Sequence, residues 1–142
     1  MMKWKLKTYP DLGLLTIRII LGLAYIFVYG GKKLFAGPET WTKIGSAVSY
    51  LGINFLYPVW GFLASSAEFF GGILILLGLF FRPAAFFIII TMLVAANRGF
   101  ITGGSLSSFA HPLELGITLL GLFLIGPGKY SLDYNISGRR KI

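Results

Sequence analysis

Four long apolar runs dominate the chain, at about residues 12–34, 57–80, 83–100 and 109–125. A helix needs about 20 mostly apolar residues to cross a bilayer, whereas the strands of a membrane barrel alternate with a period of two over about ten residues. The runs here are continuous and close to the helical length. They therefore predict an all-α, polytopic membrane protein, a single transmembrane domain over residues 1–142 built as a four-helix bundle.

The segments between the runs carry turn and interface signals. The segment that joins the first two runs contains Trp and Tyr residues, which favour the headgroup level, so we expect a short interfacial helix at about Thr40–Leu51. Phe81-Arg82-Pro83 leaves room for only a tight turn, and the Gly/Ser-rich residues 102–108 predict a loop. Gly126-Pro127-Gly128 ends the last helix, and a polar, basic C-terminal tail follows at residues 129–142.

The charge pattern indicates a membrane rather than a nucleic-acid partner. The chain has 13 Lys and Arg against 5 Asp and Glu, a net charge of +8, yet charged residues make up only 13% of it. The basic residues stand at the ends of the apolar runs, as membrane-flanking charges do, and form no continuous basic patch. We therefore expect the lipid bilayer as a partner and no nucleic acid.

Cysteine is absent and histidine occurs once. This composition excludes disulfides, thiolate metal sites, iron–sulfur clusters and a haem held by two histidines of one chain. We expect no metal site and no intrinsic cofactor, so redox chemistry would need a bound molecule or a partner protein.

Lysines and arginines are unevenly divided between the two sides of the predicted bundle. Four spans put both termini on one side, which holds eight of them: Lys3, Lys5, Lys7, Arg82, Lys129, Arg139, Arg140 and Lys141. The other side holds four: Lys32, Lys33, Lys43 and Arg98. Because cytoplasmic segments carry the excess of Lys and Arg, we expect a multi-pass protein of the inner membrane with both termini in the cytoplasm.

Reporter fusions test this orientation. A reporter that is active only in the cytoplasm should give a signal when fused after Ile142 and none when inserted in the loop at residues 102–108. A signal from the loop insertion and none from the C-terminal fusion would refute the orientation.

Ionisable residues inside the apolar runs are informative, because they are costly in lipid and usually face the bundle interior. Helical spacing gives each span one polar or small stripe. The stripes are Arg18, Gly22, Tyr25, Tyr29 and Lys32; Gly61, Ser65, Glu68 and Gly72; Thr91, Ala95 and Arg98; and His111, Glu114, Thr118 and Gly121. We expect the four stripes to converge on one interior.

The rise per residue predicts two polar groups at different depths. Arg18 and Glu68 should form an inner ion pair, and an outer polar cluster should gather around Glu114. The candidate ligand-binding pocket comprises Arg18, Tyr25, Tyr29, Lys32, Lys33, Glu68, Arg98, His111 and Glu114. A structural interpretation stays open, in which the charged pair only fixes helix register, the tyrosines pack, and the two lysines anchor at headgroups.

Three segments resemble one known family. They are Arg18-Ile-Ile-Leu-Gly22 with Gly30-Gly-Lys32-Lys33-Leu34; Ala67-Glu68-Phe69-Phe70-Gly71-Gly72 with Leu77-Gly78-Leu79 and Arg82-Pro83; and Gly126-Pro127-Gly128-Lys129-Tyr130-Ser131-Leu132-Asp133. Together they are similar to the DoxX-like proteins. The resemblance implies a four-helix membrane bundle and a subunit of quinone-linked thiosulfate oxidation, an accessory of oxidative-stress enzymes, or a relative of cargo receptors. Tyr29 stands before Gly30, where the family often has a histidine.

Three functions follow from these observations. The first is a subunit or accessory of a quinone-linked redox system, with quinone as the candidate cofactor and a redox protein as partner. The alternative is a non-catalytic scaffold or receptor for a partner protein, and a small-molecule transporter is third. No catalytic residue is assigned, since no nucleophile triad, phosphate loop or HExxH motif is present, and whether the protein is an enzyme stays open. Pairing into a homo-oligomer through outer helix faces is also compatible with the glycine content.

Overall fold

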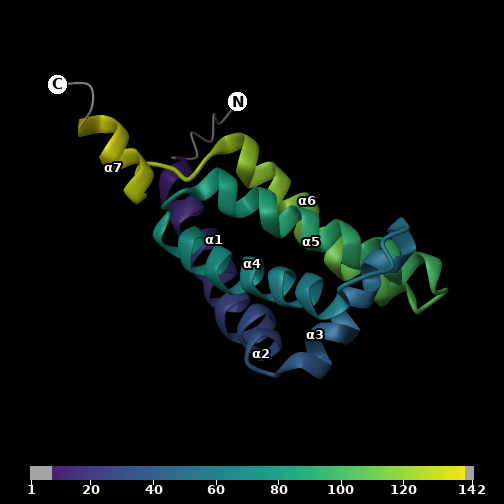
Figure 1. The fold of residues 1–142 in the computed structure, drawn as a ribbon. Coiled ribbons are helices and arrows are strands. Elements are labelled where there is room, and N and C mark those ends of the chain that lie inside the picture. The colour runs from purple at the N-terminus through teal and green to yellow at the C-terminus, as the bar shows by residue number, and fades with distance from the viewer. Residues whose placement is uncertain (1–7, 140–142) are drawn as a thin grey trace, which may run out of the picture.

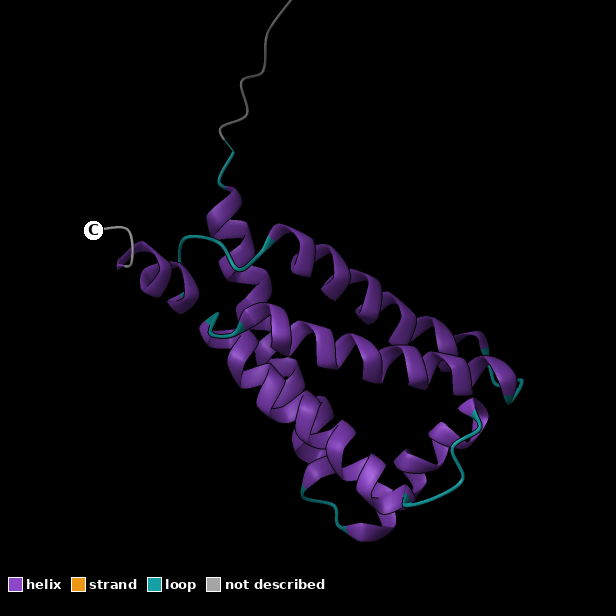
Figure 2. Cartoon of the chain, turned by 45° about the horizontal axis from the view of Figure 1, so that its top comes forward, coloured by secondary structure: helices purple, strands orange, loops and turns teal. Residues whose placement is uncertain are grey.

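The computed structural model describes residues 8–139 as a bundle of long helices joined by short helical segments and loops (Figures 1 and 2). The elements in chain order are α1 (Pro10–Leu23), the π-helix η1 (Ala24–Gly30), α2 (Gly31–Leu34), α3 (Pro38–Gly45), the 3₁₀-helix η2 (Ser46–Leu51), α4 (Tyr57–Leu77), α5 (Phe81–Ile101), α6 (Leu106–Ile125) and α7 (Leu132–Arg139). No strand occurs within residues 8–139.

Among residues 8–139, four continuous helical stretches are long and apolar enough to cross a membrane: Pro10–Leu34, Tyr57–Leu77, Phe81–Ile101 and Leu106–Ile125. The first of them is α1, η1 and α2 in succession. The all-α, four-span bundle is therefore confirmed, and the protein is a multi-pass membrane protein. Of the residues used for the orientation, Lys3, Lys5, Lys7, Arg140 and Lys141 lie outside the described residues.

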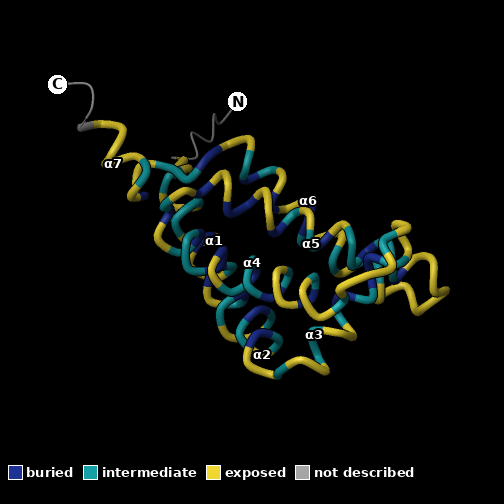
Figure 3. The backbone as a smooth tube through the Cα atoms, in the orientation of Figure 1, coloured by how far each residue is buried: buried dark blue, intermediate teal, exposed yellow. Residues whose placement is uncertain are grey.

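The helices follow one another as neighbours in space. α1 and η1 pack on α4, α4 packs on α5, and α5 packs on α6, with α3 lying along α4. The start of α1 and the short α7 lie at the same end of the bundle (Figure 1). The core contains Tyr25, Ile75, Phe81, Ile88 and Leu119, all fully buried. Exposed positions recur along the outer side of the helices (Figure 3). They include the large apolar residues Phe27, Phe87 and Leu124, which acyl chains would cover.

The linking helix predicted at Thr40–Leu51 is present as α3 and η2. It begins two residues earlier than predicted, because Pro38 suits the first turn of a helix. Glycine allows α3 to lie almost against the backbone of α4, since a Cβ on Gly45 would overlap the carbonyl oxygen of Tyr57. Trp41 Nε1 donates to the carbonyl oxygens of Lys33 and Leu34 (3.1 and 3.2 Å), which ties α3 to α2.

The end of the chain departs from the predicted polar tail, because residues 132–139 form α7. Ser131 caps this helix: its hydroxyl accepts a hydrogen bond from the backbone N–H of Tyr134 (3.2 Å). Such a cap satisfies one of the free N–H groups of a first helical turn. The Ser131-Leu-Asp sequence carries this signal, since serine before an acidic first turn is typical of a helix start.

Glycines set the distance between the first span and α4. A Cβ on Gly22 would lie 2.7 Å from Cβ of Leu76, and one on Gly72 would lie 2.7 Å from Cβ of Tyr25. At Gly30 the added atom would overlap the backbone of Phe69. Lipid acyl chains are as apolar as the helix surface, so the hydrophobic effect does not drive helices together within a bilayer. Close backbone approach of this kind is then a main source of helix association, through van der Waals packing.

Replacement of Gly30 by alanine should therefore destabilise the bundle. Because the clash is with backbone, we expect Gly30→Ala to lower the free energy of unfolding by about 1–3 kcal/mol, as overpacking does. Gly13→Ala is the matched control, since Gly13 is exposed and a Cβ there meets nothing within 4 Å. Unfolding by SDS titration in mixed micelles measures both variants. Equal stability of the two would contradict the close packing.

Candidate functional site

A π-helical segment changes which side chains of the first span face inward. η1 covers Ala24–Gly30, and a π-helix places more residues in each turn than an α-helix does. Arg18, Gly22 and Tyr25 face the bundle interior as predicted. After the π-helix, the inward-facing positions are shifted by about one residue toward the C-terminus. Lys33 takes the inward position, whereas Lys32 is exposed. Single π-turns inside helices are frequent at functional sites.

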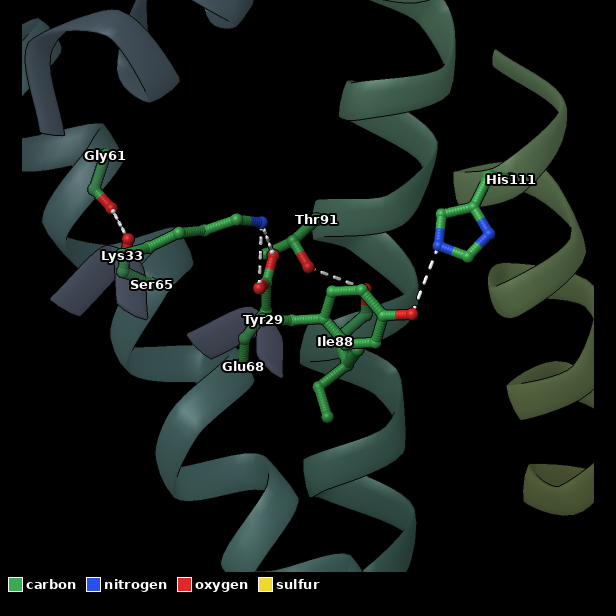
Figure 4. Close-up of polar contacts among 8 residues, drawn as sticks. All are labelled: Tyr29, Lys33, Gly61, Ser65, Glu68, Ile88, Thr91 and His111. Atoms are coloured by element: carbon green, nitrogen blue, oxygen red, sulfur yellow. Dashed lines mark hydrogen bonds and ion pairs between the residues drawn. The ribbon is translucent and has the colours of Figure 1, made fainter. Parts of the chain in front are cut away.

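Lys33 and Glu68 form an ion pair inside the bundle (Figure 4). The Lys33 ammonium donates to both carboxylate oxygens of Glu68 at 3.0 Å. Glu68 is the twelfth residue of the 21-residue α4, so it lies near the middle of that span. Its side chain is 4% exposed and that of Lys33 is 35% exposed, so the pair is reached through the lysine. An ion pair at this depth satisfies a carboxylate that lipid cannot solvate.

Tyr29 lies between this pair and α6 (Figure 4). The Tyr29 hydroxyl and His111 Nε2 are 3.2 Å apart, and the two ring centroids are 5.8 Å apart. Tyr25 precedes Tyr29 by four residues, with ring centroids 5.5 Å apart. The Tyr25 hydroxyl is buried and has no hydrogen-bond partner within residues 8–139. Two phenols, an ammonium, a carboxylate and an imidazole are thus arranged across the first span, α4 and α6.

Arg18 lies in a second polar centre at the end of the bundle where α4 stops. The residue is 1% exposed. Its Nε and Nη2 donate to the carbonyl oxygens of Ile75 and Leu76, both at 3.1 Å. Its Nη1 donates to the carbonyl oxygens of Pro127 and Tyr130, at 2.8 and 3.2 Å. Arg18 therefore joins three segments of the chain through backbone oxygens alone.

The predicted Arg18–Glu68 ion pair is wrong. Glu68 is seven residues before Ile75 on α4, a separation of about 10 Å along a helix axis. Side chains on a helix lean toward its N-terminus, so Arg18 reaches toward the start of α1 and away from Glu68. The last carbonyls of α4 lie there, and a carbonyl oxygen has two lone pairs, so the Ile75 oxygen accepts from Arg18 as well as from the backbone N–H of Gly78 (3.1 Å).

The predicted outer cluster around Glu114 does not form. Glu114 is exposed, and its carboxylate has no hydrogen bond or ion pair within the described part of the chain. Arg98 instead donates from Nη1 to the carbonyl oxygen of Lys43 (2.8 Å), at the end of α3. The stripe through His111 and Glu114 lies on the flank of α6, because the buried face of that helix is Gly116, Leu119 and Leu122. The stripe predicted on α4, by contrast, is buried along its whole length.

Asp133 is a structural residue that spacing alone does not reveal. Its two carboxylate oxygens accept hydrogen bonds from the backbone N–H groups of Phe80 and Phe81, both at 2.9 Å. It therefore caps α5, although it lies more than 50 residues further along the chain. Gly78 adjoins this contact: a Cβ there would lie 2.5 Å from Cβ of Ser131 and 2.7 Å from Nη2 of Arg18.

The fold and these two centres define a class: a four-span helical membrane protein with a buried ion pair at mid-span and an arginine bound to backbone carbonyls at one end. The sequence profile of DoxX matches residues 13–103, more than half of the chain. The chain belongs to the DoxX family. No curated protein and no solved structure matches it.

The site has hydrogen-bonding and proton-transfer groups but no cluster of metal ligands. No group of three or more His, Asp or Glu side chains that could hold a metal ion occurs among residues 8–139. The ammonium of Lys33 and the phenol of Tyr29 are donors to a carbonyl or phenolate oxygen. The ion pair with Tyr29 and His111 is therefore suited to a small molecule with oxygen acceptors.

Disruption of the ion pair from one side should destabilise the protein. Lys33→Gln leaves the Glu68 carboxylate buried without its counter-charge, which costs about 3 kcal/mol for a buried pair. The double variant Lys33→Gln/Glu68→Gln should recover most of that loss, because no buried charge remains. Lys32→Gln, at the exposed neighbouring lysine, should change stability by less than about 0.5 kcal/mol.

SDS titration of wild type, Lys33→Gln, Glu68→Gln and the double variant gives the coupling energy by a double-mutant cycle, and Lys32→Gln is titrated beside them as the control. Equal losses for Lys33→Gln and Lys32→Gln would show that Glu68 does not depend on the inward lysine.

Proposed function

We propose that this DoxX-family protein is a membrane subunit or accessory of a quinone-linked redox system, and that it binds the quinone headgroup beside the Lys33–Glu68 pair. The observation that carries the proposal is the depth and access of that pair. It lies at mid-span, where apolar quinones are dissolved, and its ammonium is partly open while its carboxylate is buried.

The residues around the pair fit a quinone headgroup. A quinone presents two carbonyl oxygens that accept hydrogen bonds, and when reduced it takes up protons on them. Lys33 and Tyr29 offer N–H and O–H donors for such oxygens. The buried Tyr25 hydroxyl, which lacks a partner among the described residues, is a further donor of this kind. Buried polar groups in native proteins nearly always have a partner, so an unpaired phenol favours a bound ligand.

Protons would pass through the chain's own groups. His111 contacts the Tyr29 hydroxyl and is itself exposed on α6, so it links the inner donors to the outside of the bundle. Histidine side chains are common proton carriers in proteins. Glu68 holds the Lys33 ammonium in place and balances its charge.

Electrons would have to come from a partner protein. The chain has no cysteine and one histidine, so its own residues bind no iron–sulfur cluster and no bis-histidine haem. The family membership and the four apolar spans support a place beside such a partner in the inner membrane, with both termini in the cytoplasm.

A non-catalytic scaffold or receptor is the second candidate, and α7 favours it. This helix projects from the end of the bundle (Figure 1) and exposes Tyr134 and Ile136 at 52% and 48%. Exposed aromatic and aliphatic side chains beyond the membrane spans are typical of protein contact surfaces. The experiment below separates the two functions, because a scaffold needs no quinone.

Quinone content of the purified protein tests the proposal. Wild type, Glu68→Gln and Glu114→Gln are purified in mild detergent from native membranes, and quinone per protein is measured after solvent extraction. Wild type should retain quinone. Glu68→Gln should retain about tenfold less quinone. Without the Glu68 carboxylate the Lys33 ammonium is no longer held in place, so its charge-assisted hydrogen bond to the quinone oxygen is lost.

Glu114→Gln is the matched control, because it removes the same charge from an exposed position outside the site. It should retain quinone like wild type. Quinone at detergent background in all three proteins, or equal retention by both variants, would overturn the proposal.

A further inference from the structure

A cavity of about 370 Å³ opens at the end of the bundle where α1 begins and α6 ends. It is separate from the Lys33–Glu68 pair, because Glu68 lies nine residues before the end of α4 and that distance is about 13 Å along a helix. The chain segment after α6 forms one wall, and α7 forms another. Its lining includes the side chains of Asp11, Arg82, Ile125, Lys129 and Asp133.

The two carboxylates of the cavity are already engaged. Asp133 accepts two backbone hydrogen bonds at the start of α5. Asp11 accepts one from the backbone N–H of Lys129 (3.0 Å) and lies 3.9 Å from the ammonium of the same residue. At that length the ion pair is loose, and the Lys129 side chain is 67% exposed. Its ammonium therefore keeps donors for another acceptor.

Arg82 is the cation of the cavity with the most free donors. Its Nε donates to the carbonyl oxygen of Phe123 (3.2 Å), which fixes the plane of the guanidinium. Its two Nη groups have no hydrogen bond or ion pair within residues 8–139. A planar guanidinium held in this way is well suited to a phosphate, because two parallel N–H groups can meet two oxygens.

The cavity adjoins the apolar surface of the spans. α1, α4, α5 and α6 all begin or end at this end of the bundle, so it lies at the membrane surface. Ile125 is 68% exposed at the cavity rim. On α5, the exposed Phe86 and Leu93 follow Arg82 at helical spacing and share its face. A cavity that holds Arg82 and Lys129 beside two carboxylates already engaged in hydrogen bonds therefore leads directly onto an apolar, lipid-facing surface.

We propose that this cavity binds the phosphate of a membrane phospholipid. The guanidinium of Arg82 and the ammonium of Lys129 donate to the phosphate oxygens, and the acyl chains lie along the exposed face of α5 and α6. Free phosphate has the same anionic oxygens, but the adjoining apolar surface favours the lipid. A bound lipid would bridge the start of α5 and the segment that leads to α7.

Native mass spectrometry of the full chain tests the proposal. Delipidated protein in detergent is mixed with phosphatidylglycerol, with diacylglycerol of the same chains, or with inorganic phosphate. Wild type should retain one phosphatidylglycerol and no diacylglycerol. Arg82→Gln/Lys129→Gln should bind phosphatidylglycerol about tenfold more weakly, through loss of charge-assisted hydrogen bonds.

Lys43→Gln/Arg98→Gln is the matched control, since it removes two cations at the other end of the bundle. It should bind phosphatidylglycerol like wild type. Equal binding by the two double variants would overturn the proposal. Displacement of the lipid by equimolar inorganic phosphate would also overturn it, and would identify the ligand as free phosphate.

If Arg82→Gln/Lys129→Gln does not fold, the retention of the two lipids by wild type still tests the proposal. Retention of diacylglycerol by wild type to the same extent as phosphatidylglycerol would show that the phosphate is not recognised. Preference for phosphatidylglycerol would support the proposal.

Discussion

The buried guanidinium of Arg18 is the constraint on which the arrangement of this bundle depends. It donates to backbone oxygens at the end of α4 and in the segment after α6, so it joins the first span to both. A buried charge without partners is strongly destabilising, and here only the assembled bundle supplies those partners. A lysine offers one compact ammonium and could not reach four oxygens in two directions, which explains an arginine at this position.

The same end of the bundle shows how distant parts of the sequence complete each other. Asp133 caps α5, Ser131 caps α7, and the missing side chain of Gly78 leaves room for both Ser131 and Arg18 beside it. The two caps satisfy backbone N–H groups that a helix start leaves unpaired. In a membrane protein that requirement is severe, because lipid offers no hydrogen bonds. The segment from Gly126 to Asp133 is therefore part of the bundle's structure and not a loose tail.

Much of the fold could be predicted from the sequence, and the two polar centres could not. The spans follow from continuous apolar runs, and the buried stripe of Gly61, Ser65, Glu68 and Gly72 follows from regular α-helical spacing. The inward position of Lys33 depends on η1, and no residue type in Ala24–Gly30 predicts a π-helix. The partners of Arg18 are backbone carbonyls, which have no signature in the sequence. The flank position of Glu114 depends on how α6 packs on α5.

One physical rule connects both polar centres. Side chains lean toward the N-terminus of their own helix, and the first span runs antiparallel to α4. Arg18, near the start of that span, therefore reaches the end of α4, while Lys33, at its other end, reaches back to the middle of α4 and Glu68. Because of this lean, Arg18 is buried and holds the helices together, whereas the Lys33 side chain stays partly accessible. Arg18 therefore satisfies backbone oxygens at one end of the bundle, and Lys33 alone of the two cations balances the buried charge of Glu68 at mid-span.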